Sequence, residues 1–262
     1  MKQRIITAII ALMVFIPVIF IGGILVDITA VVLGLVALSE VVIMRKKLLI
    51  SMEAIIAFLG VVCLIIPANF SNLLPDYLSP AFLFYFLVIL LLLATVFSKN
   101  RFNFDDVAVY TLAMLYIGFG FHYFIVARQD SLTTLLYALF IVWCTDSGAY
   151  FVGKYFGKHK LAKHISPNKT WEGSIGGTVI ATIVCTIFVM FYPISGISTF
   201  SMLIFTIILS IFGQLGDLVE SALKRFYDVK DSGKILPGHG GILDRFDSLL
   251  FVLPLLHLLG IV

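Results

Sequence analysis

The sequence GQLGDLVESALKRFYDVKDSGKILPGHGGILDRFD runs from Gly213 to Asp247 and gathers six acidic side chains, five basic side chains and one histidine between two apolar segments. The chain as a whole is 61% hydrophobic and only 13% charged, so such a density of charge is unusual for it. A charged side chain at the centre of a membrane-spanning helix costs about 2.5–3.5 kcal/mol on insertion scales. We therefore expect these charges to lie at a membrane boundary and to serve the function of the protein.

The apolar segments on either side of this stretch belong to a series that runs through all 262 residues. About 20 apolar residues in a helix cross about 30 Å of hydrocarbon, and the chain contains such segments repeatedly. The composition excludes a soluble protein and predicts an all-α, polytopic membrane protein. Nine spans are predicted: Ile5–Ile21, Ile24–Met44, Met52–Ala68, Ala81–Phe97, Val107–Ala127, Leu132–Val152, Gly173–Phe191, Phe200–Leu218 and Phe246–Ile261. A re-entrant hairpin at Gly22 and Gly23 is the alternative, and it would leave eight spans.

The positions of the basic residues test this topology. With nine spans, 17 of the 18 Lys and Arg residues lie on the side of the N-terminus, and only Arg128 lies opposite. Because basic loops are retained in the cytoplasm, we expect this side to be cytoplasmic. The two long polar stretches, Gly153–Gly173 and Ser221–Asp244, lie on that side. We interpret residues 1–262 as one integral-membrane catalytic domain, with N-terminal helices in about 1–130 and the active site in about 131–262.

The acidic residues of the opening stretch have helical spacing. Asp217, Glu220 and Ser221 stand at i, i+3 and i+4, so they share one face if the eighth span continues as a helix. Asp244 and Asp247 repeat the i, i+3 spacing where the ninth span begins. Oxygen ligands of this kind suit Mg²⁺, which also retains sites for phosphate oxygens. The alternative is a set of surface ion pairs with the neighbouring basic side chains.

A glycine-rich turn, Pro237–Gly241, precedes the last span. Glycines allow backbone N–H groups to approach a ligand closely, and a helix N-terminus favours anions. His239 lies between two glycines and has few local packing partners. The basic side chains nearby could neutralise phosphate charge, and they are Lys224, Arg225, Lys230 and Arg245. Anion-binding and cation-binding groups in one segment indicate a metal–nucleotide complex.

A second polar block extends from Trp143 to Gly177. Asp146 lies inside an apolar segment, where a carboxylate requires a cation, a metal or a proton. Residues Ser166–Thr170 are interpreted as a turn that leads into the seventh span, with Glu172 in its first helical turn. This turn could cap the helix or, with Lys169, hold a phosphate. The GxxxG spacing of Gly173 and Gly177 is typical of close helix packing.

The segment from Ser221 to Asp247 resembles the signature of the CDP-diacylglycerol synthases (phosphatidate cytidylyltransferases) throughout its 27 positions. The matching residues are Ser221, Leu223, Lys224, Arg225, Lys230, Asp231, Gly233, Leu236, Pro237, His239, Gly240, Gly241, Ile242, Asp244, Arg245, Phe246 and Asp247. The block from Asp146 to Gly177 is similar to the second recurring region of that family. The resemblance implies that CTP and phosphatidic acid react to give CDP-diacylglycerol and pyrophosphate, with Mg²⁺ required and a second cation left open. It also implies a homodimer in the inner membrane of a bacterium, with the active site facing the cytoplasm and no nucleic-acid partner.

On this basis we expect three groups of site residues. The predicted metal ligands are Asp217, Glu220, Asp244 and Asp247. The predicted catalytic residues are Lys224, Arg225, Lys230, Asp231, His239 and Arg245. The predicted substrate-binding residues are Asp146, Ser166, Lys169, Ser221, Gly240 and Gly241.

Two other functions fit parts of the sequence. A CTP-dependent kinase of a lipid alcohol would need a base, which His239 or an aspartate could supply, and would release CDP instead of pyrophosphate. A transporter would account for intramembrane acids such as Asp27, Glu40 and Asp146. Transport predicts charges near the middle of several spans, whereas here the charges collect at one face. The sequence identifies no partners for Asp27 and Glu40.

Overall fold

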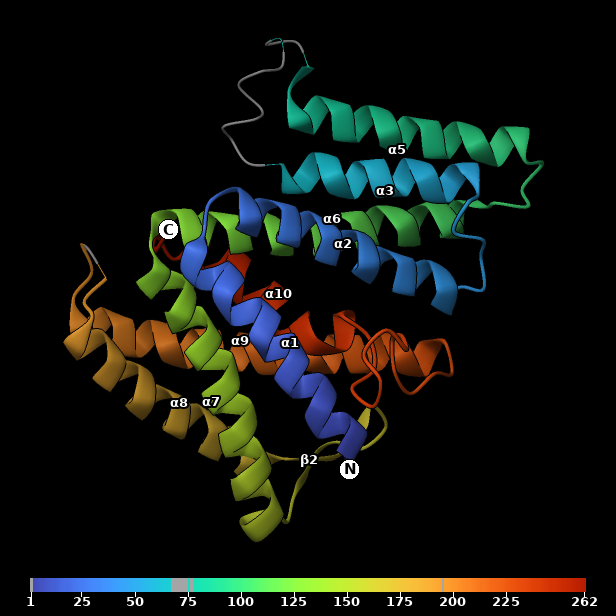
Figure 1. Ribbon diagram of the computed structural model, residues 1–262. Coiled ribbons are helices and arrows are strands. Elements are labelled where there is room, and N and C mark those ends of the chain that lie inside the picture. The colour runs from blue at the N-terminus through green and yellow to red at the C-terminus, as the bar shows by residue number, and fades with distance from the viewer. Residues whose placement is uncertain (1, 67–74, 76–77, 195) are drawn as a thin grey trace. The chain divides into compact units, whose positions relative to one another are not determined.

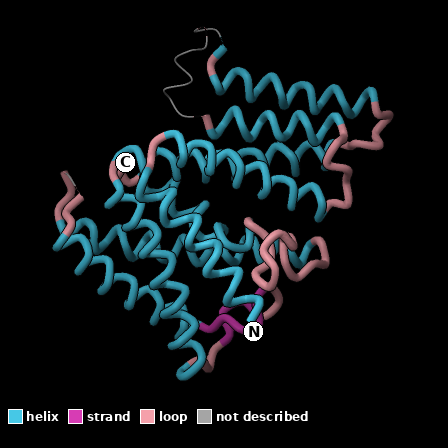
Figure 2. The backbone as a smooth tube through the Cα atoms, viewed as in Figure 1, coloured by secondary structure: helices cyan, strands magenta, loops and turns pink. Residues whose placement is uncertain are grey.

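The computed structural model describes residues 2–66, 75, 78–194 and 196–262. The chain folds as two compact units, residues 1–126 with 232–243, and residues 127–231 with 244–262. Within the described part of the chain, nine α-helices and one two-stranded sheet make up the regular secondary structure (Figures 1 and 2). Whether the units act as the single predicted catalytic domain stays a prediction.

Six helices are long and apolar enough to cross a membrane: α2 (Ile24–Met44), α5 (Pro80–Phe97), α6 (Phe104–Asp130), α7 (Leu132–Phe156), α8 (Trp171–Phe191) and α9 (Thr199–Phe226). The apolar part of α1 (Lys2–Ile21), α3 (Met52–Ile65) and α10 (Leu243–Leu258) are shorter. Each predicted span coincides with a helix, so the helical architecture is confirmed. Six helices are suited to cross a membrane by length and composition, and the crossing by all nine stays a prediction. The predicted end of the third span, Ala68, lies outside the described residues.

The first unit consists mainly of apolar helices. Helix α2 packs against α1 and α3, and α3 packs against α5, beside which it lies in Figure 1. Helices α1 and α2 are separate and are joined by Gly22 and Gly23, whose φ angles of 74° and 60° few other residues adopt. A Cβ atom on Gly60 of α3 would collide with the Met114 side chain of α6, so glycine permits these two helices to approach. Buried side chains of α2, α3 and α6 form the core, among them Leu38, Ile65, Ile117 and Phe121.

The second unit contains α7, α8 and α9, with α8 packed against both of the others. A chain of buried or half-buried polar side chains links the three helices. The Thr145 and Ser210 hydroxyls lie 2.8 Å apart, and the Ser210 hydroxyl donates to Thr178 Oγ1 at 3.1 Å. Gln214 Nε2 also donates to Thr178 Oγ1, at 3.0 Å. Such hydrogen bonds satisfy polar groups that lipid cannot.

A small antiparallel hairpin between α7 and α8 departs from the all-α prediction (Figure 2). Strand β1 (Lys160–Ala162) pairs with β2 (Ser166–Thr170), so the predicted turn at Ser166–Thr170 is wrong. A strand is tolerated at Pro167 because each strand of a two-stranded sheet has a free edge, where no ladder hydrogen bond is lost. The predicted helix start is confirmed, since the Thr170 hydroxyl accepts a hydrogen bond from Gly173 N at 3.1 Å and Glu172 lies in the first turn.

Candidate active site

The second unit contains a cavity of about 640 Å³ that is lined by charged side chains from five parts of the chain. These parts are α7, β2, α9, the loop after α9 that carries Asp231, and the start of α10. The cavity includes eight of the residues predicted from the sequence: Asp146, Lys169, Asp217, Lys224, Asp231, Asp244, Arg245 and Asp247. The two polar blocks of the sequence, Trp143–Gly177 and Gly213–Asp247, therefore both contribute to one cavity.

Asp217 pairs with a lysine from the hairpin. Lys169 Nζ lies 2.5 Å from Asp217 Oδ2, and the Ser221 hydroxyl donates to Asp217 Oδ1 at 3.3 Å. The second contact exists because α9 continues to Phe226, past the end of the predicted span at Leu218, so the predicted common face of Asp217 and Ser221 is confirmed. Asp217 thus holds Lys169 at the cavity wall. An anion in the cavity would compete with Asp217 for the ammonium group of Lys169.

Lys224 binds two carboxylates at once. It forms an ion pair with Glu220 one turn earlier on α9, and its Nζ lies 2.6 Å from Asp244 Oδ1 at the start of α10. The side chain of Glu220 is fully buried and that of Asp244 is 4% exposed. Because buried carboxylates need a compensating charge, Lys224 joins the two helices. Glu220 does not line the cavity, and its predicted role as a metal ligand is left without support from its position.

The remaining acids of the cavity affect one another electrostatically. Asp146 experiences the charge of Asp217, and Asp247 experiences the charges of both. Lys169 and Arg245 oppose this repulsion at Asp146. Hard oxygen donors that line one cavity suit a cation such as Mg²⁺. Among the residues that the structure describes, however, no three His, Cys, Asp or Glu side chains are close enough to form a complete metal site.

Helices α7 and α8 pack closely together, and both contribute residues to the cavity, among them Asp146 of α7 and Gly173 of α8. A Cβ atom on Gly173 would lie 2.7 Å from the Ala149 carbonyl oxygen, and one on Gly177 would lie 2.5 Å from the Thr145 carbonyl oxygen. Both distances are too short for any real Cβ atom. The GxxxG interpretation as helix packing is therefore confirmed, and Gly173 also lines the cavity.

Replacing Gly177 with alanine is expected to destabilise the protein by about 1–3 kcal/mol, because the added methyl group meets helix backbone that cannot move aside. The effect would appear as a lower melting temperature in detergent. Gly213→Ala is the comparison, since its nearest neighbour is a Val252 side-chain carbon at 3.2 Å, farther away than the backbone oxygen that meets Gly177 at 2.5 Å. Equal melting temperatures for the two variants would contradict the packing argument.

Several predicted site residues do not line this cavity. Arg225 is exposed and donates from Nε to the Ile165 carbonyl oxygen at 3.2 Å, and Lys230 is also exposed. Ser166 lies in β2 and Ser221 supports Asp217 from outside the cavity. His239, Gly240 and Gly241 belong to the first unit. Contacts of these residues with substrate stay predictions.

The cavity also contains polar residues that the sequence interpretation did not select: Tyr150, Lys154, Asn168, Thr170, Ser174 and Gln214. Some of them had a usable signal. Tyr150 and Lys154 follow Asp146 at i+4 and i+8, and Gln214 precedes Asp217 by three residues, so each shares a helix face with a selected acid. The side chain of Gln214 donates to Thr178, which explains its burial without any ligand.

Glu40, for which the sequence identified no partner, is 1% exposed and lies in α2. Its carboxylate accepts hydrogen bonds from the Ser232 hydroxyl at 2.8 Å, Ile242 N at 2.7 Å and Leu243 N at 2.9 Å. All four residues belong to the first unit. Glu40 therefore organises the glycine-rich segment that carries His239.

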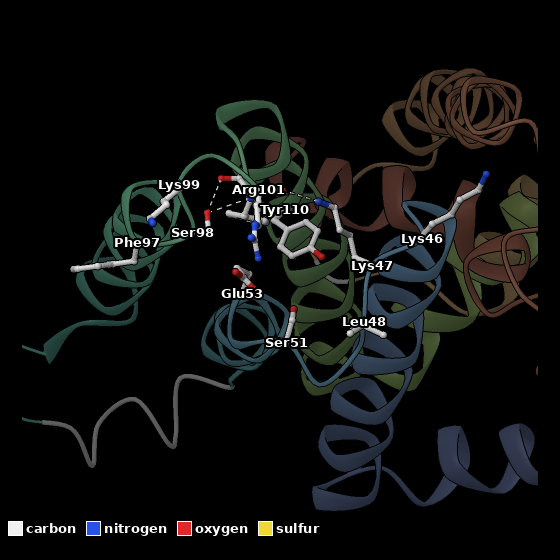
Figure 3. Close-up of a pocket in the computed structure, with 11 residues that line it drawn as sticks. Lys46, Lys47, Leu48, Ser51, Glu53, Phe97, Ser98, Lys99, Arg101 and Tyr110 are labelled. Carbon is white, nitrogen blue, oxygen red and sulfur yellow. Dashed lines mark hydrogen bonds between the residues drawn. The ribbon is translucent and has the colours of Figure 1, made fainter.

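The first unit has a cavity of its own, of about 540 Å³, at the ends of α2 and α5 (Figure 3). Its charged lining is mainly basic, and Figure 3 shows the Arg101 guanidinium directed toward Glu53, the one acid of the lining. The basic residues are Lys46, Lys47, Lys99 and Arg101. Lys47 Nζ also lies 3.0 Å from Asp106 Oδ2. One acid cannot supply a cation site, so the acid-rich cavity of the second unit is the better candidate active site.

Comparison with known proteins shows the family to which this chain belongs. The cytidylyltransferase family matches residues 2–262. A phosphatidate cytidylyltransferase of Bacillus subtilis (strain 168) is 51% identical over 262 residues, which cover 99% of this chain and 97% of that protein. A phosphatidate cytidylyltransferase of Staphylococcus haemolyticus (strain JCSC1435) is 48% identical over 264 residues, covering 99% of this chain and 98% of that protein. This chain therefore belongs to the cytidylyltransferase family and is a nucleotidyltransferase enzyme.

Proposed function

We propose that this enzyme is a phosphatidate cytidylyltransferase that transfers CMP from CTP to phosphatidic acid and releases pyrophosphate. The observation that carries the proposal is the meeting of the two family blocks in one cavity, where Asp146, Asp217 and Asp247 lie with Lys169, Lys224 and Arg245. Such a cavity can hold cations and phosphates together. The two relatives are phosphatidate cytidylyltransferases, and about half of their residues are identical to those of this chain over nearly their full length.

The chemistry needs no general base. The nucleophile is a phosphate monoester, whose second pKa is about 6, so an oxygen of phosphatidic acid is already negatively charged at pH 7. That oxygen forms a bond to the α-phosphorus of CTP, and the bond from this phosphorus to the bridging oxygen of the β-phosphate breaks. The main obstacle is the repulsion between two polyanions. Lys169, Lys224 and Arg245 would offset it by binding phosphate oxygens.

A divalent cation, proposed as Mg²⁺, would be held by Asp217 and Asp247 with help from Asp146. Support comes from the oxygen chemistry of these side chains and from their mutual repulsion, which a cation would relieve. Bound there, the cation would polarise phosphate oxygens and stabilise the charge of the departing pyrophosphate. In this proposal Lys169 exchanges Asp217 for a substrate phosphate, which frees the carboxylate. Asp244 stays with Lys224 and keeps α9 and α10 together.

The proposed setting is the cytoplasmic face of the bacterial cell membrane. The support is the position of 17 of the 18 basic residues on one side of the predicted topology. Phosphatidic acid would enter from the bilayer with its headgroup at that boundary. A homodimer is also proposed, and its support is the family resemblance alone.

Incubation of the purified protein with labelled CTP, phosphatidic acid and Mg²⁺ is expected to give pyrophosphate and lipid-linked cytidine in equal amounts. Chelation with EDTA should abolish both products, because the cavity acids would then repel substrate, and added Mg²⁺ should restore them. Thin-layer chromatography of the lipid and an enzymatic pyrophosphate assay measure the two products. Formation of CDP and a new lipid phosphate from a lipid alcohol would instead identify a kinase.

A further inference from the structure

We propose that Glu40 is a positioning residue for the active site, whose carboxylate fixes the beginning of the helix that carries Asp244 and Asp247. The inference rests on the proposed function in that it assigns these aspartates to the catalytic cavity. Glu40 itself lies far away in the chain and outside the signature segment. Its role would be to set where α10 starts.

The hydrogen bonds of Glu40 are directed at one short segment. Oε1 accepts from Ile242 N, and Oε2 accepts from Leu243 N and from the Ser232 hydroxyl. Both ends of the segment Ser232–Leu243 are thus bound to the same carboxylate. The segment closes as a loop around Glu40, which is almost completely inaccessible to solvent.

Two of these donors are the backbone N–H groups at the start of α10. The first N–H groups of any helix lack partners within the helix, and a side chain just before the helix usually supplies the acceptor. Here the acceptor comes from α2, 203 residues away in sequence from Leu243. A carboxylate at this position also interacts favourably with the helix dipole. The start of α10 therefore depends on a residue of another helix, and Asp244 is the next residue along.

Two glycines of the signature segment make this arrangement possible. A Cβ atom on Gly233 would lie 2.6 Å from Glu40 Oε1, and one on Gly241 would overlap Oε2. The sequence interpretation assigned the glycines near His239 to a close approach of backbone to substrate. For Gly241, the close approach in the structure is to Glu40 and to the Ser232 hydroxyl that donates to it, each of which the added Cβ atom would overlap. Contacts within the protein, and not only contacts with substrate, therefore require glycine at position 241.

Asp27 provides a matched control on the same helix. It is also an acid of α2, it is half-buried, and the structure shows no hydrogen bond or ion pair for its side chain among the described residues. A general need for acidic residues in α2 would affect both positions. A positioning role predicts an effect at Glu40 alone, with Asp27→Asn retaining the activity of the unchanged protein.

The test compares Glu40→Gln and Glu40→Ala with Asp27→Asn in the full-length protein. Glu40→Gln preserves shape but cannot accept with both oxygens, so kcat should fall by about 10–100-fold, the range found for groups that orient metal ligands. The Mg²⁺ concentration for half-maximal rate should rise, whereas KM for CTP should change little. Trypsin should cleave faster after Lys234, which is exposed within the tethered segment. Cleavage after Lys160 and Lys163 in the hairpin should stay unchanged.

A double variant separates the two explanations for Gly241. Gly241→Ala should impair activity in the unchanged protein and impair it less in Glu40→Ala, because the carboxylate is then gone and only the Ser232 hydroxyl still meets the added methyl group. Losses that multiply, wild-type kcat in Glu40→Ala, or faster cleavage at every tryptic site would overturn the proposal. The cleavage assay does not depend on activity. A wild-type protein that releases no pyrophosphate would refute the proposed function, while cleavage at Lys234 would still decide whether Glu40 holds the segment.

Discussion

Replacing Asp217 with asparagine is expected to lower kcat for cytidylyl transfer by at least about 10²-fold, a loss typical for removal of one group that stabilises transition-state charge. Asp217 interacts with several other charged residues of the cavity. It pairs with Lys169 and its charge acts on both Asp146 and Asp247. Asparagine keeps the shape but supplies no charge for a cation. Steady-state pyrophosphate release at saturating CTP and phosphatidic acid measures the effect.

The control for this variant is Asp228→Asn. Asp228 is exposed, lies just beyond α9 and has a φ of 53°, a conformation that asparagine tolerates. Its activity should equal that of the unchanged protein. Both variants should elute as folded protein and melt at similar temperatures in detergent. Near-normal turnover in Asp217→Asn would remove the proposed cation ligand and, with it, the proposed exchange of Lys169.

Replacing Lys224 with methionine is expected to produce the largest loss of stability. The change leaves the charges of Glu220 and Asp244 without their shared cation in a buried setting, and breaking a buried pair from one side costs about 3–5 kcal/mol. For a protein of this size the melting temperature should fall by roughly 10 °C. Activity should fall as well, because Lys224 lines the cavity. Thermal unfolding in detergent, followed by tryptophan fluorescence, measures the first effect.

Two further variants show whether the ion pairs cause that loss. Lys234→Met removes an exposed lysine and should leave the melting temperature unchanged. In the Glu220→Gln, Lys224→Met double variant, stability should partly recover because the fully buried carboxylate is also neutralised. Activity should not recover with it. A double variant less stable than Lys224→Met would show that Glu220 has another stabilising partner.

Local periodicity was sufficient to predict part of the site. The i, i+3, i+4 spacing of Asp217, Glu220 and Ser221 predicts one helix face, and α9 is helical through all three residues, although only Asp217 lines the cavity. The end of α9 was harder to predict from the sequence. Hydropathy indicates where a chain leaves the lipid, but it does not indicate where the helix ends. The predicted span ended at Leu218, whereas the helix continues through charged residues to Phe226.

Interactions between distant segments were outside the reach of the sequence. Strand β2, which pairs with β1, includes Pro167. Proline argues against a strand unless its nitrogen lies on an unpaired edge of the sheet, and the sequence does not show where such an edge is. The ion pair between Lys169 and Asp217 and the hydrogen bonds of Glu40 join residues from 48 to 203 positions apart. Charge and hydropathy indicated that Glu40 needed partners but could not identify them. Only the folded backbone brings N–H groups of α10 to it.

The hydroxyl and amide ladder of Thr145, Ser210, Thr178 and Gln214 has a consequence for how substrate can be accommodated. Hydrocarbon offers no replacement for these hydrogen bonds, so sliding or rotating α7, α8 or α9 against one another would leave several polar atoms unsolvated together. We therefore expect the backbone of the helices that carry Asp146 and Asp217 to be rigid. Adjustment to a bulky nucleotide is then expected in the side chain of Lys169, which lies on the short strand β2 and takes no part in this ladder.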